Sequence, residues 1–148
     1  MRKALAALGV HLLVCAVIGS AFVFAYDVIP AAYRFLFHLS LTAVAITLYV
    51  WGGRRLARQA NRPCHALAVL APSLLVLAVW LACWSVSQFD ASAAGLEWIG
   101  YLMANASFYP LLTLSTVAAP VLVFALGALL PSALLWLGWK SVRLRAAS

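Results

Sequence analysis

The chain has 148 residues, of which 67% are apolar and only 9% are charged, and its formal net charge is +7. A typical soluble domain is about 45–50% apolar and about 25% charged, and a domain of this size has too much exterior to hide the excess apolar surface from water. The composition therefore excludes a soluble globular domain and predicts an integral membrane protein of the all-α class.

The positive charge is concentrated in short patches beside apolar runs. Nine of the ten basic residues form three such patches: Arg2 and Lys3; Arg54, Arg55, Arg58 and Arg62; Lys140, Arg143 and Arg145. Lys and Arg in short loops stay on the cytoplasmic side of a membrane and attract anionic headgroups there. A nucleic-acid site needs a solvated basic face instead, so we expect membrane lipids, and no nucleic acid, as partners.

The first membrane span is predicted at about 4–26. Its apolar run starts after the first basic patch and continues to Tyr26. Gly19-Ser20-Ala21 resembles the cleavage site of a signal peptide, but the run has the length of a span, about 20 residues, rather than that of the shorter signal core. We therefore interpret it as a span with its amino terminus inside.

The second and third spans are predicted at about 31–51 and 64–87, on either side of a polar loop. Pro30 ends the first span because it cannot donate a backbone hydrogen bond, and Pro63 opens the third. The loop carries the topology-determining arginines and no acid, so we expect it on the cytoplasmic side. These arginines are Arg54, Arg55, Arg58 and Arg62.

The apolar run 98–139 is too long for one span and allows two interpretations. Two spans split near Pro110 or Pro120 would place the last basic patch outside. One span preceded by an interfacial helix would place it inside with the other patches, as the positive-inside rule favours. We therefore predict a short outer interfacial helix at about 93–108 and a tilted or bent fourth span at about 110–139.

The resulting prediction is a single transmembrane helical bundle over 1–148, with four membrane-spanning helices and both termini cytoplasmic. All three acids and Arg34 would then lie outside. The absence of an internal repeat gives no support to an inverted-repeat transporter. We expect the bundle in a bacterial inner (cytoplasmic) membrane.

His11 is the one ionisable side chain predicted deep in a span, and such residues are functional candidates. Cys15 lies one turn further on the same helix face, and His65 lies at the inner mouth of the third span. These three residues form a candidate intramembrane polar site, opposed by the simpler interpretation of a neutral histidine bonded to a neighbouring helix. No metal-ligand spacing or catalytic constellation accompanies them, so we expect no enzyme activity, cofactor or metal.

Small residues four positions apart indicate close helix packing, within the bundle or with a partner. These pairs are Cys15 and Gly19, Ala16 and Ser20, Ala21 and Ala25, and Ala128 and Ser132. The leading functional hypothesis is a non-enzymatic accessory or scaffold subunit of a larger membrane complex, whose partner is another membrane protein or a further copy of the chain. A small homo-oligomeric transporter, flippase or channel is the alternative, and a redox or metal-binding protein is the third.

Overall fold

The computed structural model describes residues 2–58, 66–88, 98–113 and 120–145, and every regular element within these ranges is a helix. In chain order they are α1 (Arg2–Ala25), η1 (Ala31–Tyr33), α2 (Arg34–Arg58), α3 (Ala66–Val86), α4 (Ile99–Ala104), η3 (Ala106–Phe108), α5 (Tyr109–Leu112), α6 (Pro120–Gly127) and α7 (Leu130–Arg145). Within these ranges, four helical stretches are long and apolar enough to cross a membrane: Arg2–Ala25, Ala31–Arg58, Ala68–Val86 and Val123–Val142. The all-α class and the presence of four such helices are thereby confirmed.

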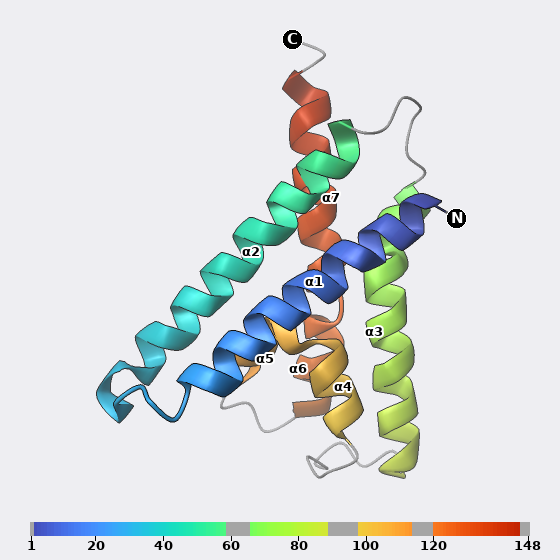
Figure 1. Cartoon of the computed structure of the whole chain (residues 1–148). Coiled ribbons are helices and arrows are strands. Elements are labelled where there is room, and N and C mark those ends of the chain that lie inside the picture. The colour runs from blue at the N-terminus through green and yellow to red at the C-terminus, as the bar shows by residue number, and fades with distance from the viewer. Residues whose placement is uncertain (1, 59–65, 89–97, 114–119, 146–148) are drawn as a thin grey trace.

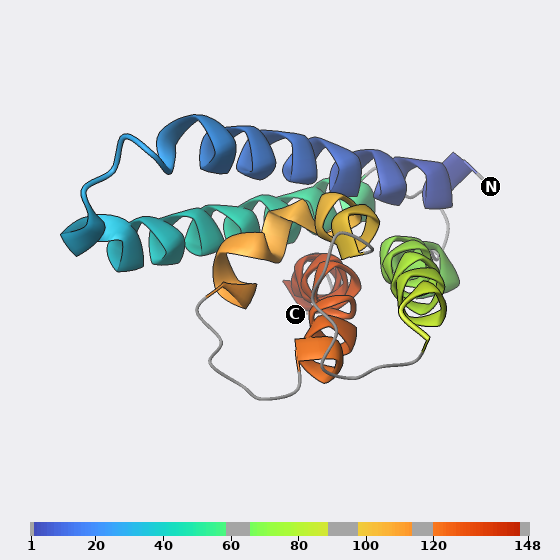
Figure 2. The ribbon, with the colours of Figure 1, turned by 90° about the horizontal axis from the view of Figure 1, so that it is seen from below.

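The long helices form two layers with the short ones between them. Figure 1 shows α1 and α2 side by side, joined by a short connection. Helix α7 crosses α2, and α3 lies on the side of α7 away from α2. Seen from below, α4 and α5 lie between the α1–α2 pair and the α3–α7 pair (Figure 2). The start of α1 and the ends of α2 and α7 lie at the same end of the bundle, which brings the basic patches on those helix ends to that end.

The backbones of α2 and α7 touch where the two helices cross. A Cβ atom on Gly53 would overlap the carbonyl oxygen of Leu135, and one on Gly138 would overlap the carbonyl oxygen of Val50. Each helix therefore has a glycine where the other presents its backbone, which is how small residues let helices approach closely in lipid.

A reciprocal pair of serines joins α3 to α7. The backbone N–H of Ser73 donates to Ser132 Oγ at 3.1 Å, and the backbone N–H of Ser132 donates to Ser73 Oγ at 3.4 Å. Both serines follow a proline, Pro72 inside α3 and Pro131 in the first turn of α7. A first-turn N–H has no partner within its own helix, so the hydroxyl of Ser73 supplies one for Ser132.

Two helix boundaries differ from those predicted. The second span was expected to end at 51, but α2 continues to Arg58 with Arg55 and Arg58 in its last turn. Basic side chains there interact favourably with the negative end of the helix dipole, so the arginines extend the helix. The fourth span, expected at 110–139, is interrupted by a turn at Ala128 and Leu129, because Pro131 starts a new helix, and the stretch suited to span a membrane is Val123–Val142.

The segment expected as an outer interfacial helix at 93–108 lies inside the bundle in its described part. We call residues 98–112, which contain α4, η3 and α5, the insert. Trp98, Tyr101 and Phe108 are at most 1% exposed, because these large apolar rings fill the space between the long helices. The same aromatic composition that suits a membrane interface thus builds a core here. Residues 93–97 lie outside the described ranges.

Replacing Gly53 or Gly138 by alanine should lower the free energy of unfolding by about 1–3 kcal/mol, the usual cost of overpacking, because α2 and α7 must move apart. Gly9→Ala in α1 is the matched control, since a Cβ there meets no atom within 4 Å. This control should be neutral or stabilising by up to about 1 kcal/mol. SDS-induced unfolding in mixed micelles measures both, and equal stabilities of the Gly53 and Gly9 variants would contradict the backbone contact.

Candidate functional site: the polar cluster around His11

Four buried polar side chains from three elements meet near the middle of α1. His11 is 0% exposed, and Cys15 lies one turn further along α1. Tyr49 comes from α2 and Ser107 from η3, and both are also 0% exposed. We call these four side chains the His11 cluster.

The hydrogen-bond partners within the His11 cluster determine which of its atoms carry the hydrogens. His11 Nε2 lies 2.9 Å from the carbonyl oxygen of Ala104, and since a carbonyl oxygen only accepts, Nε2 carries the hydrogen. In a neutral imidazole Nδ1 then accepts the hydrogen of Tyr49 Oη, 2.6 Å away. Because this uses the only hydrogen on Tyr49 Oη, Ser107 Oγ donates to Tyr49 at 2.9 Å. Both ring nitrogens of His11 are therefore engaged.

The thiol of Cys15 completes the cluster at longer distances. Its Sγ lies 3.6 Å from both the carbonyl oxygen of Ala104 and Ser107 Oγ, and 3.8 Å from His11 Nε2. A thiol is a weak donor, so Cys15 contributes packing more than hydrogen-bond energy.

A second network holds the insert to α6. Tyr101 Oη donates to the backbone carbonyl of Phe124, and Asn105 Nδ2 donates to Tyr101 Oη at 2.8 Å. A phenol carries its hydrogen at neutral pH, so Tyr101 is the donor to the carbonyl of Phe124. Gly127 leaves room for both side chains, since a Cβ there would lie 3.2 Å from Tyr101 Oη. The two networks together fix the insert on both of its sides.

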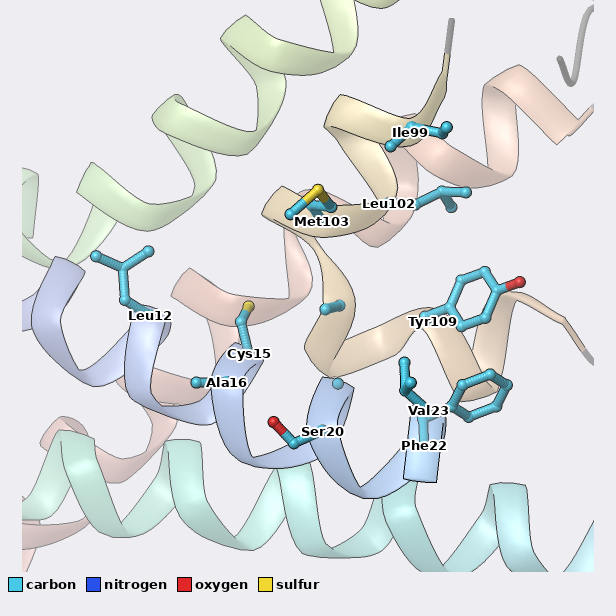
Figure 3. A pocket seen from close by; sticks show the side chains of 12 residues that line it. Leu12, Cys15, Ala16, Ser20, Phe22, Val23, Ile99, Leu102, Met103 and Tyr109 are labelled. Atoms are coloured by element: carbon cyan, nitrogen blue, oxygen red, sulfur yellow. The ribbon is translucent and has the colours of Figure 1, made fainter. Parts of the chain in front are cut away.

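A groove of about 630 Å³ lies beside the His11 cluster, between α1 and the insert (Figure 3). We call it the α1 groove. Small and apolar side chains line it, among them Ala16, Ser20 and Val23 of α1 and Ile99, Met103 and Tyr109 of the insert. Cys15 also lines the groove, and it connects the groove to the polar cluster.

The predicted site residues are brought together only in part. His11 and Cys15 meet, as their spacing requires, whereas His65 and Arg62 lie outside the described ranges. Arg54, Arg55 and Arg58 lie at the end of α2. There Arg54 Nε donates to Ser141 Oγ of α7 at 3.1 Å, and the Arg55 guanidinium lies 5.3 Å from the centre of the Trp51 ring.

Sequence reasoning missed Tyr49 and Ser107, the two side chains that complete the cluster. A tyrosine hydroxyl usually finds a partner when it is buried, but Tyr49 lies near the inner end of the predicted span 31–51, where a tyrosine also suits the membrane interface. The identity of its partner depends on how the insert folds back between the helices, which local spacing does not encode.

The arrangement is suited to holding helices together. Binding a metal at His11 would displace the hydrogen bond from Tyr49 or the one to Ala104, because each ring nitrogen already has a partner. In the described ranges no group of three or more His, Cys, Asp or Glu side chains is placed to bind a metal ion.

No protein-family model matches the chain, and the chain matches no curated protein and no solved structure. The contacts of the His11 cluster and of the α1 groove therefore carry what can be inferred about function.

Tyr49→Phe should lower the free energy of unfolding by about 1–2 kcal/mol, because it leaves His11 Nδ1 without a donor and Ser107 without its acceptor inside the bundle. Tyr33→Phe is the matched control, since Tyr33 is 61% exposed in η1, and it should change stability by less than about 0.5 kcal/mol. Unfolding in mixed micelles compares the two, and a Tyr49 variant as stable as the control would rule out the hydrogen-bond chain.

Proposed function

We propose that the chain is a non-enzymatic accessory or scaffold subunit of a larger membrane protein complex. The observation that carries this proposal is the complete pairing of His11, the one ionisable side chain buried near the middle of α1. Its ring joins α1 to Tyr49 of α2 and to the carbonyl of Ala104 in the insert. The polar chemistry of the bundle interior therefore serves to position helices.

The outer face of α2 is the surface best suited to a protein partner. Ser40, Ala43 and Thr47 lie along one exposed stripe of this helix, and small residues are typical of helix–helix contacts in membranes. The hydroxyl of Ser40 donates to the carbonyl of Leu36, and that of Thr47 donates to the carbonyl of Ala43. Both hydroxyl groups already have acceptors within α2. A neighbouring helix that packs on the stripe therefore meets no unpaired hydrogen-bond donor from Ser40 or Thr47.

The basic end of the bundle supports the orientation that we propose, with both termini cytoplasmic. Arg54, Arg55 and Lys140 lie on the neighbouring ends of α2 and α7. Such clusters next to membrane-spanning helices stay inside and bind anionic headgroups. In this orientation the insert enters the bundle from the outer side, and its irregular backbone is tolerated at membrane depth because protein surrounds it.

A small transporter or channel is the second candidate, favoured by the interrupted helices. The insert breaks between α4 and η3, and the fourth span breaks between α6 and α7. Transporters often build their binding sites from discontinuous helices near the middle of the membrane. A pore in this bundle would have to be lined by the hydroxyls of the second and fourth spans. They do not favour this function, since Thr42 donates to the carbonyl of His38 and Thr113 to that of Pro110. Ser115 and Thr116 lie outside the described ranges.

The accessory function predicts a stoichiometric second polypeptide when the full chain is extracted gently from its own membranes and weighed by native mass spectrometry. Deleting the gene for this chain should lower the amount of that polypeptide in the membrane. Ala43→Leu fills the α2 stripe and should reduce the co-purified partner, whereas Ala6→Leu on the exposed face of α1 should not.

A homo-oligomer free of other polypeptides would contradict the accessory function. Reconstitution of that oligomer into liposomes would then test the transporter function, because a transporter moves its substrate without further subunits. Equal partner recovery from the Ala43 and Ala6 variants would exclude the α2 stripe as the contact surface.

A further inference from the structure

We propose that the α1 groove binds one acyl chain of an anionic phospholipid whose headgroup lies at Arg34. The proposal concerns a surface away from the α2 stripe and does not depend on the accessory function. It rests on the lining of the groove, on its dimensions, and on Arg34, a cation beyond one of its ends that forms no ion pair with any of the described residues.

The lining of the α1 groove requires an apolar occupant. The side chains that form it are mostly aliphatic or aromatic, and Met103 and Val23 at its edges are 72% and 69% exposed. The groove runs along α1, one of the helices suited to cross a membrane, so its surroundings are bilayer hydrocarbon. Hydrocarbon gains dispersion contacts with this lining, and Ser20 and the tip of Tyr109 are among its few polar groups.

The dimensions of the α1 groove favour a lipid chain over the helix of a second copy. Its α1 lining runs from Leu12 to Val23, a rise of about 16 Å at about 1.5 Å per residue. Over that length, about 630 Å³ corresponds to a mean cross-section of about 40 Å². A helix of about 10 Å diameter occupies about 80 Å². The mean cross-section of the groove is therefore about half that of a helix, which suits a thinner, extended chain.

Arg34 supplies the charge that selects the headgroup. Its guanidinium lies 4.7 Å from the centre of the Tyr26 ring, and its Nε is buried without a hydrogen-bond partner among the described residues. Asp27, the acid nearest to it in the sequence, is exposed. No ion pair between the two is present in the described part of the chain. A guanidinium forms strong charge-assisted hydrogen bonds with phosphate oxygens.

Aromatic rings connect Arg34 to the α1 groove. Tyr26 stacks on Phe22 at 4.9 Å between ring centres, and Phe22 meets Tyr109 edge to face at 4.9 Å. Phe22 and Tyr109 both line the groove, at the end marked by Val23 (Figure 3). We infer that the headgroup of a chain lying in the groove leaves it at this end and extends past Tyr26 to Arg34, which does not itself line the groove.

Photo-crosslinking in vesicles tests the proposal with the full chain. The vesicles consist of phosphatidylcholine with a trace of phospholipid that carries a diazirine in one acyl chain, attached to either a phosphatidylglycerol or a phosphatidylcholine headgroup. We expect both probes to label peptides containing Leu12 and Met103, with about fivefold more label from the anionic probe, the preference that one basic side chain near a membrane surface gives. Free inorganic phosphate should not compete with the anionic probe.

Two substitutions separate the chain site from the headgroup site. Ala16→Phe fills the groove and should abolish labelling by both probes, while Ala6→Phe, the same change at an exposed α1 position that does not line the groove, should leave labelling unchanged. Arg34→Gln should retain chain labelling and remove the preference for the anionic probe. Gel filtration of each variant verifies that it is folded.

Three outcomes would overturn the proposal. Equal labelling by the two probes in the unaltered protein would show that Arg34 selects no headgroup. Label spread evenly over all helices, with no loss in the Ala16 variant, would show general contact with bilayer lipid only. A crosslink between two copies through the groove would show that a second chain occupies it.

Discussion

The carbonyl oxygen of Ala104 is the group that the rest of the interior has to satisfy. It lies at the end of α4, where a helix leaves its last carbonyls without partners, and it is partly buried beside the α1 groove. His11 Nε2 donates to it, and this contact determines which nitrogen of the ring accepts from Tyr49. The orientation of Tyr49, and through it that of Ser107, follows from this one acceptor. An apolar bundle with a broken segment inside it needs such a donor, because lipid offers none.

The long helices leave room for the insert by touching closely elsewhere. Gly53 and Gly138 bring α2 and α7 into backbone contact, and Ser73 and Ser132 join α3 to α7. Both contacts lie on α7, which makes this helix the common neighbour of α2 and α3. Space for the large rings of Trp98, Tyr101 and Phe108 is then available between the two layers, and these rings are completely or almost completely buried there.

Apolar patterning was sufficient to predict the class of the fold, because four long runs separated by polar or proline-containing stretches allow little else. The contact of His11 with Cys15 was also predictable, since residues four apart share a helix face. The partners Tyr49 and Ser107 were not, because they lie 38 and 92 positions from the cluster residues they contact. Local periodicity carries no information on such long-range register.

The insert shows why composition alone leaves the packing of a segment open. Trp98, Tyr101 and Tyr109 suit a membrane interface and a packed core equally well, since each ring has an apolar body and a polar tip. Inside the bundle, Tyr101 finds a partner on the backbone of α6, whereas Trp98 is buried with its indole N–H unpaired among the described residues. The pairs of small residues four positions apart also occur in two different settings. Ala128 and Ser132 are buried inside the bundle, whereas Ala16 and Ser20 line the α1 groove.

The long sequence separation between His11 and its acceptor Ala104 has a consequence for biogenesis. The two residues are 93 positions apart, so α1 and α2 leave the ribosome well before the acceptor in the insert exists. During that interval the early hairpin can pair His11 with Tyr49 but has an unused Nε2–H within its apolar surface. The insert therefore packs late in assembly, and only then does His11 Nε2–H gain its acceptor. A chain halted before residue 104 keeps this unpaired donor, by which membrane quality control can distinguish it from the finished bundle.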